Sequence, residues 1–340
     1  MLSPEYIVAI IAFAISLLSM PVIRSVAIRY HLYDQLSARK VHSSIIPRLG
    51  GVGLFIAIIL AISPFFELSR PLVALLLSAS LLFGIGIIDD IRGLKPLTKL
   101  IAQVVSALIV LTGGIGIVTI TIPILGSVLR LDNWQIPIQI LGDTYNIIPI
   151  ANAVTVSWIV VIINAINLLD GLDGLAAGVS MIALMTLAIL LGPNMTQHLV
   201  LLLAIASSMS LLGFLVSNFN PARIFMGDSG AYLIGLLVAV LPIYSTSKTA
   251  VGVLVVGLAI VDLVWAVLRR FNQGKSPFSA DRGHLHHKLL DSGIKHRTVV
   301  IIFYTVAIIT SVFLIIGQFI NAILALIFSV ILLSFASRIK

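Results

Sequence analysis

Long apolar runs, separated by short polar connections, occupy most of this chain. A helix that crosses the hydrocarbon core of a bilayer needs about 20 predominantly apolar residues. Runs that reach or approach this length lie at about residues 6–28, 50–66, 71–88, 97–118, 150–168, 174–192, 198–217, 229–246, 249–268, 299–317 and 319–337. The pattern therefore predicts an all-α polytopic membrane protein with about 11 transmembrane helices, folded as a single integral-membrane domain over residues 1–340.

The composition agrees with a membrane location. Hydrophobic residues make up 59% of the chain and charged residues only 10%, with a mean hydropathy of +1.17. Soluble domains carry about 25% charged residues. The absence of cysteine excludes disulfides, cysteine-ligated zinc, iron–sulfur clusters and thiol nucleophiles. The net charge of +8 comes from basic residues clustered between apolar runs, which indicates membrane topology rather than a nucleic-acid partner.

The distribution of lysine and arginine predicts the orientation. If the runs alternate across the membrane, 18 of the 21 basic residues fall on one side, and only Arg70, Arg130 and Lys248 fall on the other. Because basic residues accumulate in cytoplasmic loops, we expect the N-terminus outside and the C-terminus in the cytoplasm. The outer segment 119–149 contains short β-like runs and turn residues, so we expect a small hairpin or a segment that lies on the surface.

Several acidic residues gather at the predicted cytoplasmic ends of the helices. The five aspartates in these motifs are Asp89, Asp90, Asp170, Asp173 and Asp228. Ionisable groups at membrane depth are costly and usually mark function. We therefore expect one active site at the cytoplasmic face.

The stretch NAINLLDGLDGL sets four polar side chains at a spacing of three residues. On a helix, Asn164 and Asn167 share a face. The glycines that follow would loosen the helix and let Asp170 and Asp173 reach the same pocket. The alternative is that both aspartates are cap and turn residues between two helices. That alternative leaves the two asparagines, which lie inside the span, unexplained.

Two further motifs contain carboxylates suited to holding a cation. GIIDDIRGLKPLTKL has Asp89 and Asp90 at the end of one span and Lys99 at the start of the next. Adjacent carboxylates are unfavourable unless a cation or a proton relieves them. A solvated helix end followed by topological lysines is the alternative. In NFNPARIFMGDSG, Asp228 is either a helix cap or a carboxylate ligand for a hard cation such as Mg²⁺.

Basic residues and histidines fill two predicted cytoplasmic segments. RKVHSSIIPRLGG carries Lys40 and Arg48, which would hold either anionic lipid headgroups or a phosphate-bearing substrate. The predicted recognition loop, residues 269–298, carries side chains suited to phosphate or sugar binding: Arg282, His284, His286 and His287. Zinc binding by these histidines is a weaker alternative, because no cysteine or glutamate accompanies them.

Together these motifs favour metal-assisted phosphoryl transfer between a water-soluble substrate and a lipid. Carboxylate and amide oxygens suit Mg²⁺, or Mn²⁺ in its place, while Lys, Arg and His suit phosphates. An ion-coupled transporter fits less well, because the outer halves of the helices carry almost no polar residues. An intramembrane aspartyl protease using Asp89 and Asp228 also fits less well, because Phe225 stands where the Gly-x-Gly-Asp motif has glycine.

The motifs also resemble a known family, the polyprenyl-phosphate N-acetylhexosamine-1-phosphate transferases of the glycosyltransferase 4 type. The matching stretches are Asp89-Asp90, the block from Asn164 to Asp173, Pro221 to Asp228, and the histidine loop. They span nearly the whole chain in the family's order. DRGHLHHKLLDSG and RKVH…PRLGG are similar to the branch that takes UDP-GlcNAc. No further aspartate follows the Asp pair closely, because Arg92 stands there instead.

The resemblance implies a reaction and its site. Undecaprenyl phosphate would attack the β-phosphorus of a UDP-N-acetylhexosamine, with UDP-GlcNAc as the expected donor, and UMP would leave. The implied magnesium ligands are Asn167 and Asp228, and Asp89 or Asp90 would orient or deprotonate the lipid phosphate. The implied substrate contacts are Lys99 at the diphosphate, Asp170 and Phe225 at the uridine, and Arg282, His284, His286 and His287 at the sugar or its phosphate.

Four more residues complete the expected substrate site: Lys40, Arg48, Asn164 and Asp173. The resemblance also implies a multi-pass protein of the bacterial inner membrane. Its product would initiate cell-wall or surface polysaccharide synthesis. The expected partners are the UDP-sugar, the polyprenyl phosphate and the bilayer, and a homodimer is compatible with the sequence.

Overall fold

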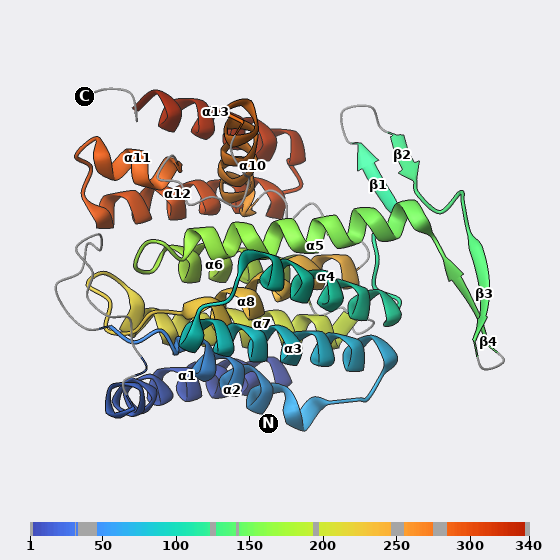
Figure 1. Cartoon of the computed structure of the whole chain (residues 1–340), viewed down its shortest axis with the longest axis horizontal. Helices are drawn as coiled ribbons and strands as arrows, with labels where there is room; N and C mark the ends of the chain where they lie inside the picture. Colours follow the sequence, from blue (N-terminus) through green and yellow to red (C-terminus); the bar gives the residue numbers. More distant parts are fainter. Residues whose placement is uncertain are drawn as a thin grey trace.

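Helices make up most of the protein (Figure 1). The computed structural model describes residues 3–30, 32, 46–122, 127–140, 143–192, 197–245, 255–274 and 284–336. The helices are α1 (Pro4–Arg29), α2 (Gly50–Ile62), the 3-10 turn η1 (Ser63–Phe65), α3 (Arg70–Arg92), α4 (Pro96–Thr112), α5 (Pro149–Leu169), α6 (Leu175–Leu191), α7 (His198–Asn218), α8 (Gly227–Tyr244), α10 (Gly257–Asn272), α11 (Leu285–Asp291), α12 (His296–Ile315) and α13 (Phe319–Ala336). Each apolar run of the sequence therefore contains a helix.

Six helices are long and apolar enough to cross a membrane: α1, α3, α5, α7, α8 and α12. Shorter apolar helices occupy Gly50–Phe65, Pro96–Thr112, Leu175–Leu191 and Phe319–Ser334. These helices support the prediction of an all-α, multi-pass membrane protein. A total of 11 spans and the sidedness stay predictions.

Helix α8 lies at the centre of the bundle, packed against α2, α3, α5, α6 and α7. Its sequence is apolar on every face, and nearly all of its residues are buried. A helix that is hydrophobic all round is stable only inside such a bundle. Small residues let its neighbours come close, since a methyl group on Gly235 would lie 2.8 Å from Cα of Ile163 on α5.

Two antiparallel hairpins connect α4 to α5, in the segment expected to contain a hairpin. Strand β1 (Thr119–Ile122) pairs with β2 (Ser127–Arg130), and β3 (Ile136–Ile140) pairs with β4 (Asp143–Ile147). The hairpins extend from the N-terminal end of α5 (Figure 1). Because α5 has 21 residues at about 1.5 Å each, its other end lies about 30 Å away.

At that other end of α5, hydrogen bonds tie together the loops on either side of α6 and α7. The buried carboxylate of Asp173 accepts hydrogen bonds from Nδ2 of Asn220 at 2.9 Å and from the backbone N–H of Ala222 at 3.0 Å. The Asn218 side chain accepts from the N–H of Gly174 at 3.0 Å and donates to the carbonyl of Ile224 at 2.9 Å. These hydrogen bonds hold the two loops together beside the polar residues at this end of α5.

The predicted recognition loop differs from the structure at its start. Residues 269–272 continue α10 instead of beginning a loop, and α11 forms a further short helix within the segment. Arg269 and Arg270 occupy the last turn of α10, where positive side chains stabilise a helix C-terminus. Hydropathy alone ends the span at the first arginine, so it misses this turn.

Candidate active site

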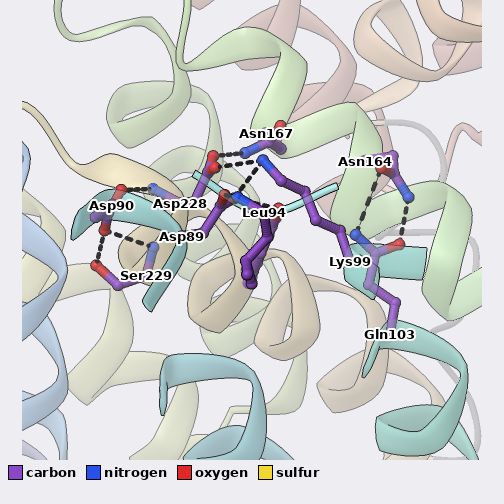
Figure 2. A network of polar contacts seen from close by, with 10 residues as sticks. Asp89, Asp90, Leu94, Lys99, Gln103, Asn164, Asn167, Asp228 and Ser229 are labelled. Carbon is purple, nitrogen blue, oxygen red and sulfur yellow. Dashed lines mark hydrogen bonds and ion pairs between the residues drawn. The ribbon is translucent and has the colours of Figure 1, made fainter. Parts of the chain in front are cut away.

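Lys99 lies between two carboxylates in a polar network at the end of the bundle (Figure 2). Its Nζ forms an ion pair with Asp89, from α3, and lies 3.0 Å from Oδ2 of Asp228, from α8. Asn167 of α5 donates from Nδ2 to Oδ1 of Asp228 at 2.5 Å. Four helices thus bring together four residues that the sequence predicts for one site.

Asp89 and Asp90 have different surroundings although they are adjacent. Besides Lys99, the Asp89 carboxylate accepts hydrogen bonds from the backbone N–H of Leu94 at 2.7 Å and the hydroxyl of Tyr232 at 3.3 Å. Consecutive side chains on a helix point about 100° apart. Asp89 therefore faces the Lys99 network, while Asp90 faces the start of α8.

The Asp90 carboxylate caps the N-terminus of α8. It accepts hydrogen bonds from the backbone N–H of Asp228 at 2.7 Å, and from the N–H and hydroxyl of Ser229 at 3.1 and 2.6 Å. Such a bond satisfies helix N–H groups that lack a partner within the helix. Asp90 thereby fixes the backbone of Asp228, and both of its oxygens are engaged.

Asp170 follows the last residue of α5 and lies beside the same helix end. Its carboxylate accepts a hydrogen bond from the N–H of Gly227. Burial, with the charges of Asp228 and Asp90 in addition, raises the pKa of Asp170 well above its usual range, and Arg48 acts in the opposite direction. Burial of this carboxyl group among others of the same charge makes a nearby cation favourable.

The donor set fits a hard cation with few protein ligands. The Asp228 carboxylate and Asn167 amide touch, and oxygen donors of this kind are the ones that Mg²⁺ takes from proteins. No group of three or more His, Cys, Asp or Glu side chains among the described residues is arranged to hold a metal ion. A magnesium ion here would therefore depend on water and phosphate oxygens for its remaining ligands, as Mg²⁺ commonly does.

Asn164 lies one helical turn from Asn167, further along α5 toward the hairpins. Its Nδ2 donates to Oε1 of Gln103 at 2.6 Å, and the Gln103 amide returns a bond to Oδ1 at 3.5 Å (Figure 2). The two amides thus satisfy each other within an apolar bundle. The structure thus places Asn164 beside Gln103, which lies on α4 one helical turn beyond Lys99.

Arg48 and Phe225 lie on two segments that pair through their backbones. The N–H of Phe225 donates to the carbonyl of Pro47 at 2.8 Å, and its carbonyl accepts from the N–H of Gly50 at 2.9 Å. Arg48 is exposed and Phe225 is partly exposed. Lys40 and Arg282, also predicted to bind substrate, lie outside the described residues.

The three predicted histidines divide into two groups. His284 and His286 are buried, at 3% and 1% exposure, and both face Asp262 of α10. His287 is partly exposed. The described part of the loop shows no zinc-type cluster.

Several polar residues of this region were not predicted from the sequence. They are Gln103, Asn218, Ser229, Tyr232 and Asp262. Two had a usable signal, since Gln103 and Asp262 are single polar residues within otherwise apolar helical stretches. Asn218 and Ser229 stand at the ends of helices, where a polar side chain is ordinary, and Tyr232 lies within the apolar sequence of α8.

Comparison with known proteins shows which family the chain belongs to. A model described as glycosyl transferase family 4 matches residues 72–246, more than half of the chain. The chain belongs to glycosyl transferase family 4. The matched range contains the Lys99 network and ends before the histidines.

Relatives in this family have names that specify a lipid substrate. The chain is 34% identical to the probable undecaprenyl-phosphate N-acetylglucosaminyl 1-phosphate transferase of Bacillus subtilis (strain 168), over 92% of the chain and 86% of the relative. It is 33% identical to the decaprenyl-phosphate N-acetylglucosaminephosphotransferase of Mycobacterium leprae (strain TN), over 78% of the chain and 72% of the relative. It is 27% identical to the undecaprenyl-phosphate alpha-N-acetylglucosaminyl 1-phosphate transferase of Salmonella typhi, over 81% of the chain and 73% of the relative. None of the three is named as a transporter.

Proposed function

We propose that this protein transfers N-acetylglucosamine 1-phosphate from UDP-GlcNAc to undecaprenyl phosphate and releases UMP. The observation that carries the proposal is the contact of Lys99 with both Asp89 and Asp228, at one end of an apolar bundle. A site there can meet a lipid phosphate from the bilayer and a nucleotide from water. The names of the relatives support the choice of substrates.

In the proposed reaction, an oxygen of the lipid phosphate attacks the β-phosphorus of UDP-GlcNAc. The bond between the β-phosphorus and the bridging oxygen breaks, and UMP leaves with the electron pair. A phosphate monoester is largely ionised at pH 7, since its second pKa is about 6. Positioning and charge neutralisation therefore have to supply most of the rate enhancement.

We assign Lys99 to the diphosphate, where its ammonium would bind the oxygens of the group being transferred. Asp89 would position Lys99 and the incoming lipid phosphate. Asp90 would act indirectly, because its carboxylate already holds the N-terminus of α8 and with it Asp228. This division gives the two adjacent aspartates separate roles.

The proposed reaction uses a magnesium ion. The Asn167 amide oxygen and Asp228 carboxylate would hold the ion, with Mn²⁺ as its substitute. Bound there, it would neutralise charge on the diphosphate. Asp170 and Phe225 would contact the uridine, and exposed Arg48 would meet a phosphate.

The proposed setting is the inner membrane of a bacterium, with the active site on the cytoplasmic side. The lipid diphosphate-sugar would initiate a cell-wall or surface polysaccharide. Release of UMP from purified protein, with undecaprenyl phosphate and Mg²⁺, tests the proposal. UDP-GlcNAc, UDP-GalNAc and UDP-MurNAc-pentapeptide are compared, with Asp228→Ala as the inactive control.

We expect UMP from UDP-GlcNAc only, lost when the lipid is omitted or Asp228 is replaced. UMP from a different donor would preserve the mechanism and overturn the choice of sugar. No UMP from any donor would overturn the proposed function.

A further inference from the structure

Asp262 is an acidic residue in the middle of an apolar helix. It lies in α10 between Val261 and Leu263 and is only 6% exposed. A carboxylate buried in such a helix is expensive unless polar groups compensate it. The residues around it therefore indicate what it does.

Among the described residues, the groups that compensate it come from the start of α11. Oδ1 accepts a hydrogen bond from the backbone N–H of Leu285 at 2.8 Å, and Oδ2 lies 3.6 Å from Nδ1 of both His284 and His286. Oδ2 and the two Nδ1 atoms are buried and have no hydrogen-bond partner among the described residues. One carboxylate thus faces two imidazoles and one helix end.

The other side of the His284 ring indicates its tautomer. Nη2 of Arg270 lies 3.5 Å from Nε2 of His284, and a guanidinium group can only donate. Nε2 therefore accepts, and in the neutral ring the proton is on Nδ1, which faces Asp262.

His286 faces the loop after α5 with its second nitrogen. A methyl group on Gly171 would lie 3.3 Å from Nε2 of His286, and Gly171 follows Asp170. With Nδ1 turned to Asp262, Nε2 is directed at the loop that begins at Asp170. Asp262 thus connects α10, α11 and the end of α5.

We propose that Asp262 is a positioning residue that fixes His284 and His286 and docks α11 against the loop at Gly171, on the UDP-sugar side of the site. Carboxylates commonly fix the tautomer and orientation of a histidine ring in this way. This inference rests on the proposed function, because it assigns α11 and the loop at Gly171 to the binding of the UDP-sugar.

One substitution separates the effect of Asp262 on the two histidines from its hydrogen bond to the N-terminus of α11. Asp262→Asn keeps an Oδ1 acceptor for Leu285 and removes the negative charge that faces the histidines. Asp291→Asn, at the exposed end of α11, is the matched control. KM for UDP-GlcNAc, KM for undecaprenyl phosphate and the melting temperature are measured for each variant.

We expect Asp262→Asn to raise KM for UDP-GlcNAc about tenfold, the lower end of the range found when a metal-bound histidine loses its orienting carboxylate. KM for the lipid and the melting temperature should stay near wild type, and Asp291→Asn should change nothing. In a His286→Ala background, Asp262→Asn should have a smaller effect on KM, because one of the two histidines that Asp262 positions is gone.

An unchanged KM for UDP-GlcNAc, with wild-type protein active, would overturn the positioning role alone. An equal rise in both KM values with a lower melting temperature would show a general structural role and would also overturn it. Wild-type protein that neither binds UDP-GlcNAc nor releases UMP would overturn the proposed function, and this inference with it.

Discussion

At the scale of single residues, Lys99 carries much of the positive charge of the proposed site. It contacts Asp89 and Asp228, and no other labelled residue of Figure 2 is cationic. We expect Lys99→Ala to lower the rate of UMP release by about 10²–10³, the usual effect of removing one preorganised electrostatic contact. Lys95→Ala is the control, because Lys95 is exposed and precedes the same helix. Similar losses in both variants would contradict a specific role for Lys99.

Substitution of Asp90 should mainly lower stability, whereas substitution of the adjacent Asp89 should mainly lower activity. Asp90→Asn replaces a carboxylate that accepts three hydrogen bonds at the start of α8, so it should cost about 1 kcal/mol, as loss of a helix cap does. Asp89→Asn should abolish most UMP release with a smaller change in melting temperature. Thermal unfolding in detergent and the UMP assay, run on both variants, check this. The reverse pattern would exchange the two roles.

The sequence predicted that Asp89, Asp90 and Asp228 lie close together, but it could not assign their roles. Rarity of charge in an apolar chain marks Asp89, Asp90 and Asp228 without any knowledge of the fold. Some of their partners come from helices more than 100 residues away in the chain, as with Asp90 and Ser229. Spacing along the sequence contains no information about such contacts.

At the scale of helices, close approach of α3 and α8 fixes the position of Asp228. A methyl group on Gly86 of α3 would collide with the backbone of Ser229, whereas one on Gly84 would meet nothing within 4 Å. Gly86→Ala should destabilise the protein by about 1–3 kcal/mol, the usual cost of overpacking, and reduce UMP release.

Gly84→Ala is the matched control for Gly86→Ala, on the same helix and with the same chemical change. It should be neutral or slightly stabilising, because alanine favours a helix over glycine by up to about 1 kcal/mol. Melting temperatures of both variants provide the check. Equal destabilisation would mean that contact with α8 is not what requires Gly86.

Apolar run length located the helices well and their ends less well. The hairpin prediction for 119–149 is confirmed, since turn residues there interrupt short β-like runs. The last turn of α10 and the whole of α11 were missed. Both lie in polar sequence, where helix formation depends on the macrodipole and on contacts such as that of Asp262 with Leu285.

At the scale of the whole molecule, the hairpins and the polar site lie at opposite ends of α5, so we expect them on opposite sides of the membrane. The chain contains no cysteine, so single substitutions give a clean accessibility test. In intact cells, a membrane-impermeant maleimide should label Asn133→Cys, between the hairpins. Lys95→Cys, in the connection from α3 to α4, should react only after the membrane is opened. Labelling of both in intact cells would contradict the predicted orientation.

The most direct test of the central claim follows the β-phosphorus of the donor. Purified protein is incubated with undecaprenyl phosphate, Mg²⁺ and UDP-GlcNAc labelled with ³²P at the β position, beside Asp228→Ala. We expect the label to move to the lipid fraction while unlabelled UMP is released, and both events to be lost in the variant. Label that remains on UDP would show transfer of sugar without its phosphate, and would contradict phosphoryl transfer at the Lys99 site.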